Sequence, residues 1–163
     1  FAGWLDTDGI GLDLRRTDLN ELAADAIAAA RATEPDRPLH LHPADRPVVL
    51  LCDRTRIRQL LDNLLANIRA HTPPGGPATL TVRAEPDAAT VDLIDAGPGI
   101  PDADRARVFD RFYWVAHTRT GGTGLGLAVV AAIAVAHHGS AAVHPGPDGV
   151  GTRMHIRLPR VSG

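Results

Sequence analysis

One glycine-rich stretch, GGTGLGL at residues 121–127, limits what this chain can fold into, because it leads directly into the apolar run AVVAAIAVAHHG. Glycine has no Cβ, so the backbone can turn tightly there and approach a ligand closely. The apolar run predicts a helix over 125–138, with Gly139 as its C-terminal cap. Unpaired amides and the positive end of the dipole at a helix N-terminus favour a phosphate. The stretch therefore predicts an anion-binding turn, with an ordinary flexible loop as the alternative.

Length and composition narrow the class of protein. A chain of 163 residues with 44% hydrophobic residues is long enough for one domain with its own core. A formal net charge of −2 offers no basic surface for nucleic acid. No stretch reaches the ~20 apolar residues that span a bilayer. The single cysteine, Cys52, follows an apolar run and predicts a buried structural thiol. Phe1 is not a natural first residue, so we expect a fragment of a longer protein.

The N-terminal third alternates between strand and helix patterns. Apolar and charged residues alternate over 12–14, which predicts a brief strand. Thr17 and Asp18 offer N-caps for a helix over 19–33, with Glu21 as a capping-box partner. Two further strands are expected over 39–42 and 48–51. His40 and His42 lie on the first of these strands, and alternation on a half-exposed strand explains them more simply than a metal site does.

A polar row runs along the helix that Asp53 is expected to cap, RTRIRQLLDNLLANIRAH at 54–71. Asn63, Asn67 and His71 recur at i, i+4 and i+8, beside a continuous apolar face. A solvated face is the simpler alternative, but Glu or Lys would be the usual residues there. Asparagine is a poor helix former, and its amide oxygen can complete a Mg²⁺ shell. We therefore interpret the row as functional.

The third segment of interest ends a β-hairpin that is expected over 78–84 and 90–95. Its second strand runs into Asp95-Ala96-Gly97-Pro98-Gly99-Ile100-Pro101. A carboxylate at a strand end can accept a hydrogen bond from the amino group of a flat ligand, and the glycines let the ring approach the backbone. A structural turn is the alternative.

Beyond it, a short helix is expected over 103–108, followed by an aromatic cluster that we interpret mainly as a hydrophobic plug: Phe109, Phe112, Tyr113 and Trp114. Residues 115–122 predict a mobile lid. Strands over 140–144 and 152–158 close the chain. His137 and His138 fall near a helix C-terminus, and the pattern assigns them no chemistry.

Taken in order, four segments resemble the catalytic, ATP-binding domain of sensor histidine kinases, within the wider group that has the Bergerat ATP fold. They are LLDNLLANIRAHTPPGG (the N box), DAGPGIP (the G1 box), VFDRFYW (the F box) and GGTGLGLAVV (the G2 box). The resemblance covers about residues 12–159 and implies an α/β two-layer sandwich. In that sandwich a mixed, mostly antiparallel sheet is backed by about three helices.

The resemblance also implies ATP and Mg²⁺ as ligands and gives residues their roles. Asn67 would coordinate Mg²⁺, Asn63 would line the phosphate side, and Asp95 would accept from the adenine amino group. Thr152 would join a water-bridged adenine contact, and Arg119 would supply a lid cation. The remaining implied contacts are His71, Gly97, Gly99, Ile100, Gly122, Thr123, Gly124, Leu125 and Gly126.

Asn63 bears on the choice within this group. Its ATP-hydrolysing members carry a glutamate there that activates water, whereas an amide cannot accept that proton. This favours phosphoryl transfer to a histidine, in which catalysis is mainly alignment and charge neutralisation. Ala70 and Trp114 stand where relatives usually carry phosphate-binding cations; Arg69, Arg111 and Arg119 are the possible substitutes. A catalytically weak, nucleotide-sensing pseudokinase is therefore an alternative, and a serine kinase of the anti-sigma type ranks below it.

The phosphoacceptor is the other expected component. None of the eight histidines stands in an H-E-x-R-T-P-like setting, so we expect the acceptor helix, sensor and membrane spans to precede Phe1. The resemblance implies a single catalytic domain over 1–163, without its dimerisation domain, and a response-regulator receiver domain as partner. We expect a monomeric fragment of a homodimeric protein, forming the cytoplasmic part of a membrane-bound sensor kinase.

Overall fold

The computed structural model describes residues 11–73, 75–96, 126–146 and 151–160. Five strands form one sheet in the order β2-β4-β5-β7-β6, in which β2 pairs parallel with β4 and the other pairs are antiparallel. Their bounds are Leu39–His42, Ala78–Ala84, Ala88–Asp95, Thr152–Pro159 and Ser140–Pro145. The predicted mixed, mostly antiparallel sheet is confirmed.

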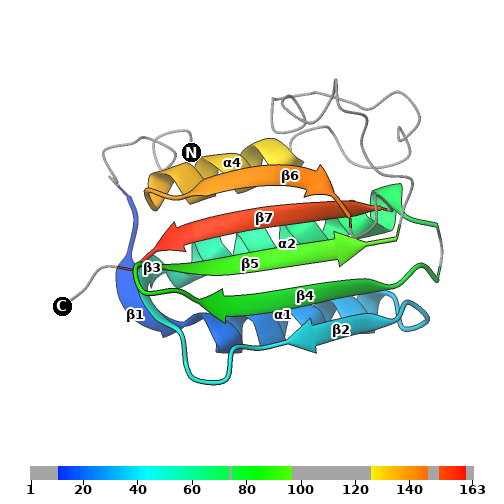
Figure 1. Cartoon of the computed structure of the whole chain (residues 1–163), viewed down its shortest axis with the longest axis horizontal. Coiled ribbons are helices and arrows are strands. Elements are labelled where there is room, and N and C mark those ends of the chain that lie inside the picture. The colour runs from blue at the N-terminus through cyan, green and yellow to red at the C-terminus, as the bar shows by residue number, and fades with distance from the viewer. Residues whose placement is uncertain (1–10, 74, 97–125, 147–150, 161–163) are drawn as a thin grey trace.

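Three described helices lie on one side of this sheet, behind it in Figure 1. They are α1 (Leu19–Thr33), α2 (Arg54–His71) and α4 (Gly126–Ala136). A separate antiparallel ribbon joins β1 (Leu14–Asp18) to β3 (Val49–Asp53) at the left of the view. The α/β two-layer sandwich that the sequence predicts is thereby confirmed. None of the described helices is long and apolar enough to cross a membrane.

The core lies between the helices and the sheet. The apolar face of α2 is fully buried, as its periodicity predicted: Ile57, Leu60, Leu61, Leu64, Leu65 and Ile68. Side chains alternate between the faces of a strand, so Val91 and Leu93 of β5 join this core while Asp92 points to the opposite face. Asp95 therefore shares the helix-covered face with Leu93. Cys52 is buried as predicted, and burial raises the pKa of its thiol.

Several local boundaries differ from the prediction, and three of these differences have a clear structural cause. β1 covers Leu14–Asp18 rather than 12–14, because pairing with β3 and not apolar alternation decides where it runs. β5 begins at Ala88, two residues early, where it pairs with Pro159. α4 ends at Ala136, and His138, not Gly139, takes the left-handed conformation with φ 64°. Gly139 is required for another reason, since a Cβ there would lie 2.1 Å from the Arg157 carbonyl oxygen.

Candidate functional site

The described segments that carry predicted site residues meet at one end of the domain, at the right of Figure 1. They are the last turns of α2, the end of β5, the start of β7 and the start of α4. These segments are far apart in the sequence, so the fold itself brings them together. The same end connects to residues 97–125, which lie outside the described residues.

A side-chain hydrogen bond joins the asparagine row to the helix after the glycine-rich stretch. Asn63 Nδ2 donates to the Gly126 carbonyl oxygen at 3.3 Å. Gly126 is the exposed first residue of α4, where helix amides have no partner within the helix. Asn63 therefore lies beside the N-terminus of α4, next to the predicted phosphate position.

Asn67 lies one turn further along α2 and is half-buried, as Asn63 is. Four residues along a helix correspond to a rotation of about 40° beyond one full turn, so the two side chains share one edge of α2. Ala70 is also half-buried. His71 is the last residue of α2, which agrees with the predicted end of that helix.

Asp95 and Thr152 are direct partners across β5 and β7, although 57 positions (152 − 95) separate them in the sequence. Thr152 is 5% exposed and lies on the helix-covered face with Met154. Gly151 precedes it with φ +74°, and a Cβ there would lie 1.9 Å from the Asp95 carbonyl oxygen. The backbone just before β7 thus packs directly against the end of β5, and only glycine fits at position 151.

Several predicted site residues lie outside the described part of the chain, and their roles stay predictions. These are Gly97, Gly99, Ile100, Arg119, Gly122, Thr123, Gly124 and Leu125. The same holds for Arg111, Trp114 and the aromatic cluster as a whole. Among the described residues, the structure joins Asn63 to Gly126 and Asp95 to Thr152, and the roles of these residues and of Asn67 in a nucleotide site stay predictions.

Arg69 is one possible substitute for the missing cation at Ala70. It is exposed, and its charge adds to the effect of Arg37, whose hydrogen bonds hold the pKa of Glu34 below its usual range. Glu34 is the C-cap of α1. The role of Arg69 as a phosphate-binding cation stays a prediction.

A buried arginine that sequence reasoning missed holds the loop after α2. Arg37 is 4% exposed and pairs with Glu34 through two contacts of 2.7 and 3.0 Å. The same guanidinium donates to the carbonyls of Gly76 at 2.7 Å and Thr72 at 3.4 Å. A single arginine between prolines has no periodicity, so no sequence pattern could have revealed this role.

A second polar cluster lies on the opposite face of the sheet. Asp92 Oδ1 accepts from Arg153 Nε and from His155 Nδ1, both at 2.8 Å. Burial alone would raise the pKa of Asp92, but these hydrogen bonds lower it below its usual range. Because the sheet separates this cluster from the helices, it takes no part in the site at the end of β5.

A family model described as histidine kinase-, DNA gyrase B-, and HSP90-like ATPase matches residues 52–162. The chain belongs to this family. It is 39% identical over 154 residues to the probable sensor histidine kinase TcrY of Mycobacterium tuberculosis, covering 93% of this chain and 32% of that protein. The predicted resemblance is confirmed: the chain is an ATP-binding catalytic domain of the histidine kinase type.

Solved structures agree with this assignment. The mycobacterial sensor histidine kinase MprB superposes with a TM-score of 0.82 at 29% identity, over 91% of this chain and 100% of that one. Full-length ShkA in complex with AMPPNP superposes with a TM-score of 0.78 at 27% identity, over 94% of this chain and 32% of that one. The chain thus spans about a third of the length of TcrY and of ShkA.

Proposed function

We propose that this domain binds Mg-ATP at the end where α2, α4, β5 and β7 meet, and transfers the γ-phosphoryl group to a histidine. That histidine would lie on the dimerisation helix of the same sensor kinase, for relay to a response regulator. The observation that carries the proposal is the hydrogen bond from Asn63 to Gly126, because it joins the asparagine row to the N-terminus of α4. The AMPPNP bound to ShkA supports a nucleotide as the ligand.

The residues present are chemically suited to both proposed ligands, ATP and Mg²⁺. The exposed N-terminus of α4 at Gly126 offers amides to a phosphate, and Asp95 offers a carboxylate to an adenine amino group. For Mg²⁺ the proposed protein ligand is the amide oxygen of Asn67. The described residues hold no group of three or more His, Cys, Asp or Glu suited to a metal, so nucleotide phosphates and water would complete the shell. Mg²⁺ would neutralise charge on the transferring phosphoryl group.

The chemistry of Asn63 favours transfer over hydrolysis. Its amide is a donor to Gly126, and an amide cannot take a proton from an attacking water. A residue that aligns α4 but does not activate water suits phosphoryl transfer to another protein group. We therefore rank a dedicated ATPase and a serine kinase of the anti-sigma type below a histidine kinase.

One observation favours a second candidate, the nucleotide-sensing pseudokinase. Ala70 brings no charge to the end of α2. A charge-assisted phosphate contact would then be missing, and such contacts are the strong ones. Fusion of this chain to a dimerisation helix with an acceptor histidine separates the candidates, because only the kinase would label that histidine with phosphate from ATP.

The proposed partners of this domain are inferred from the longer relatives of this chain. Because TcrY is a sensor histidine kinase three times as long, we propose a dimerisation domain, a response-regulator receiver domain and a membrane anchor as partners of this domain in the intact protein. We also propose that residues 1–163 act as one catalytic domain on the cytoplasmic side, and that dimerisation belongs to the other domains.

Calorimetric titration with a non-hydrolysable ATP analogue, with and without Mg²⁺, tests the nucleotide site. We expect Asn67→Ala to abolish the effect of Mg²⁺ and to weaken binding at least about tenfold, since a ligand of the metal is lost. We expect Asp95→Ala to weaken binding whether or not Mg²⁺ is present, since its proposed contact is with the base.

A matched control comes from α1. Asn20→Ala removes an asparagine of the same kind from a helix that does not reach the site, so its affinity should equal that of the wild type. Absence of binding by the wild type would reject the proposed function. Equal affinities for the wild type and the three variants, Asn67→Ala, Asp95→Ala and Asn20→Ala, would instead show that Asn67 and Asp95 do not bind the nucleotide.

A further inference from the structure

The two strands of the β1–β3 ribbon end in the same arrangement of hydrogen bonds. Each strand ends at an aspartate, Asp18 or Asp53, and each aspartate is the N-cap of the helix that follows. Each carboxylate also accepts an amide that immediately precedes the other strand: Val48 for Asp18 and Asp13 for Asp53, both at 3.0 Å. The ribbon therefore starts α1 and α2 in a nearly symmetric way.

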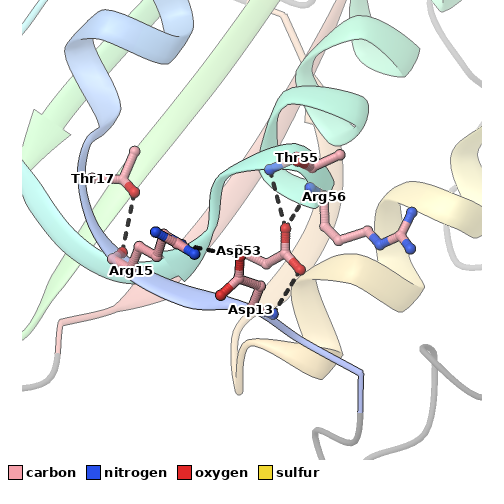
Figure 2. Close-up of polar contacts among 6 residues, drawn as sticks. All are labelled: Asp13, Arg15, Thr17, Asp53, Thr55 and Arg56. Carbon is pink, nitrogen blue, oxygen red and sulfur yellow. Dashed lines mark hydrogen bonds and ion pairs between the residues drawn. The ribbon is translucent and has the colours of Figure 1, made fainter.

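Asp53 has the fuller set of contacts. Its Oδ1 accepts from the amides of Thr55 and Arg56, both at 3.1 Å, and its Oδ2 accepts from the amide of Asp13. Figure 2 shows the carboxylate between the first turn of α2 and the chain that leads into β1. Asp53 is 6% exposed, and its three hydrogen bonds are partly buried.

The backbone of Asp53 adds a contact that breaks this symmetry. Its N–H donates to Nε2 of His137, just beyond the end of α4, at 3.0 Å. His137 Nδ1 lies 2.9 Å from the carbonyl oxygen of Ile133. A carbonyl can only accept, so Nδ1 carries the proton and Nε2 is the acceptor. Both nitrogens of the ring, which is 9% exposed, are therefore engaged.

These contacts attach α4 to α2 at both ends. At its start, the Gly126 carbonyl accepts from Asn63, and just past its end, His137 accepts from Asp53. The two attachment points on α2 lie ten residues apart, about 15 Å along the helix. A helix held at two separated points cannot slide or rotate against its neighbour without breaking one of the bonds.

We propose that His137 and Asp53 form a positioning pair, which sets where the N-terminus of α4 lies relative to Asn63 and Asn67 and thereby sets nucleotide affinity. Neither residue touches the nucleotide in this arrangement. The inference rests on the proposed function for its effect on binding. The geometric part, in which His137 controls the contact between Asn63 and Gly126, stands without any nucleotide.

The experiment uses the 163-residue chain with two variants of His137 and one control. His137→Leu removes both hydrogen-bonding nitrogens, whereas His137→Gln keeps an acceptor at the position of Nε2. Asp18→Ala removes the equivalent cap from α1, which makes it a control for general loss of stability. Nucleotide affinity is measured by calorimetry at a temperature where urea unfolding shows every variant to be folded.

We expect His137→Leu to weaken nucleotide binding about three- to tenfold, the size usual for substitutions that act through a neighbouring element. His137→Gln should recover most of the affinity, and Asp18→Ala should bind as the wild type does. A purely structural role would give a different pattern, since affinity would then follow stability in all three variants. That pattern, or wild-type affinity in His137→Leu, would overturn the proposal.

Nuclear magnetic resonance supplies a readout that needs no nucleotide. In the wild type, the imidazole ¹⁵N shifts should identify Nδ1 as the protonated nitrogen of His137. His137→Leu should shift the Asn63 side-chain amide signal and the Gly126 amide signal, and Asp18→Ala should leave both in place. Unmoved Asn63 and Gly126 signals would reject the positioning pair even if nucleotide binding is intact. If the wild type binds no nucleotide, the proposed function fails and these signals still decide the geometric part.

Discussion

Helices α1 and α2 both follow a strand of the β1–β3 ribbon, and an aspartate caps each of them. They differ in what their asparagines meet. Asn20 of α1 donates to the carbonyls of Ala44 and Arg46 and accepts the amide of Ala44, so it holds the loop between β2 and β3. Asn63 of α2 instead reaches across to the first residue of α4.

The comparison shows that the way a helix begins does not determine what that helix does. Both helices begin with the same local chemistry, in which a carboxylate satisfies amides that have no partner within the helix. The neighbours then decide the outcome. α1 uses its polar side chains to fix the surrounding chain, whereas α2 lies next to α4 and carries Asn63 and Asn67 to the end where β5 and β7 meet.

The strongest test of the symmetry between the caps is Asp53→Ala. Three amides, those of Thr55, Arg56 and Asp13, would lose their acceptor in a partly buried setting. We expect the free energy of unfolding to fall by about 2–3 kcal/mol, since a lost cap and a lost third hydrogen bond both contribute. Urea unfolding measures the change.

Asp18→Ala is the matched variant, with a smaller expected loss of about 1–2 kcal/mol because Asp18 is only half-buried. Equal losses for Asp18→Ala and Asp53→Ala would contradict the asymmetry that we draw from the second helix amide bound by Asp53 and from its deeper burial.

Asn20→Ala tests the structural half of the comparison. The variant loses three hydrogen bonds to the loop at Ala44 and Arg46, in a partly exposed setting. We expect a loss of about 1–2 kcal/mol in unfolding free energy, because each such bond contributes modestly. A thermal or urea unfolding curve records it. An unchanged curve would mean that the loop does not depend on α1.

Stability comparisons between the caps also depend on pH, through Asp92. The folded state holds the pKa of Asp92 below its usual range, so its contribution is fully present above the unfolded pKa of about 3.9. That contribution is lost as the pH falls through the lower, folded pKa. We expect Asp92→Asn to cost about 1 kcal/mol at neutral pH and to flatten the fall in stability below about pH 4.

Urea midpoints measured from pH 2 to 7 test this expectation. Parallel pH profiles for Asp92→Asn and the wild type would show that other carboxylates control acid unfolding. In that case the cap comparison would need no pH correction for Asp92.

The sequence predicted much of the fold because periodicity marks both amphipathic helices and the sheet strands. α1 runs over Leu19–Thr33 and α2 begins after Asp53, both as predicted, and both caps are aspartates that the pattern identified. The position of β1 was mispredicted because it depends on pairing with β3, in which Leu14 pairs with Asp53, 39 residues (53 − 14) further along the chain. Local alternation of apolar and charged residues cannot show such a pairing.

The site was predictable only where residues stand in a spaced motif. Asn63, Asn67 and Asp95 are predicted in this way, and the fold places the segments that carry them toward one end of the domain. His137 and Arg37 were not, because each acts through hydrogen bonds to backbone groups that are distant in the sequence. In the sequence, a histidine at the end of an apolar helix gives the same pattern whether or not the backbone amide of a distant residue donates to it.

The smallest expected effect concerns an ion pair that could be thought to distinguish α2 from α1. Arg58 and Asp62 form an i,i+4 pair on α2 at 2.9 Å, with side chains 33% and 47% exposed. Solvent screens such a pair, and the basic residue precedes the acidic one, which is the less favourable order along a helix. We expect Arg58→Ala to change the unfolding free energy by no more than about 0.5 kcal/mol. A loss as large as that of Asp53→Ala, measured in the same urea titration, would mean that surface charge and not the buried cap distinguishes α2.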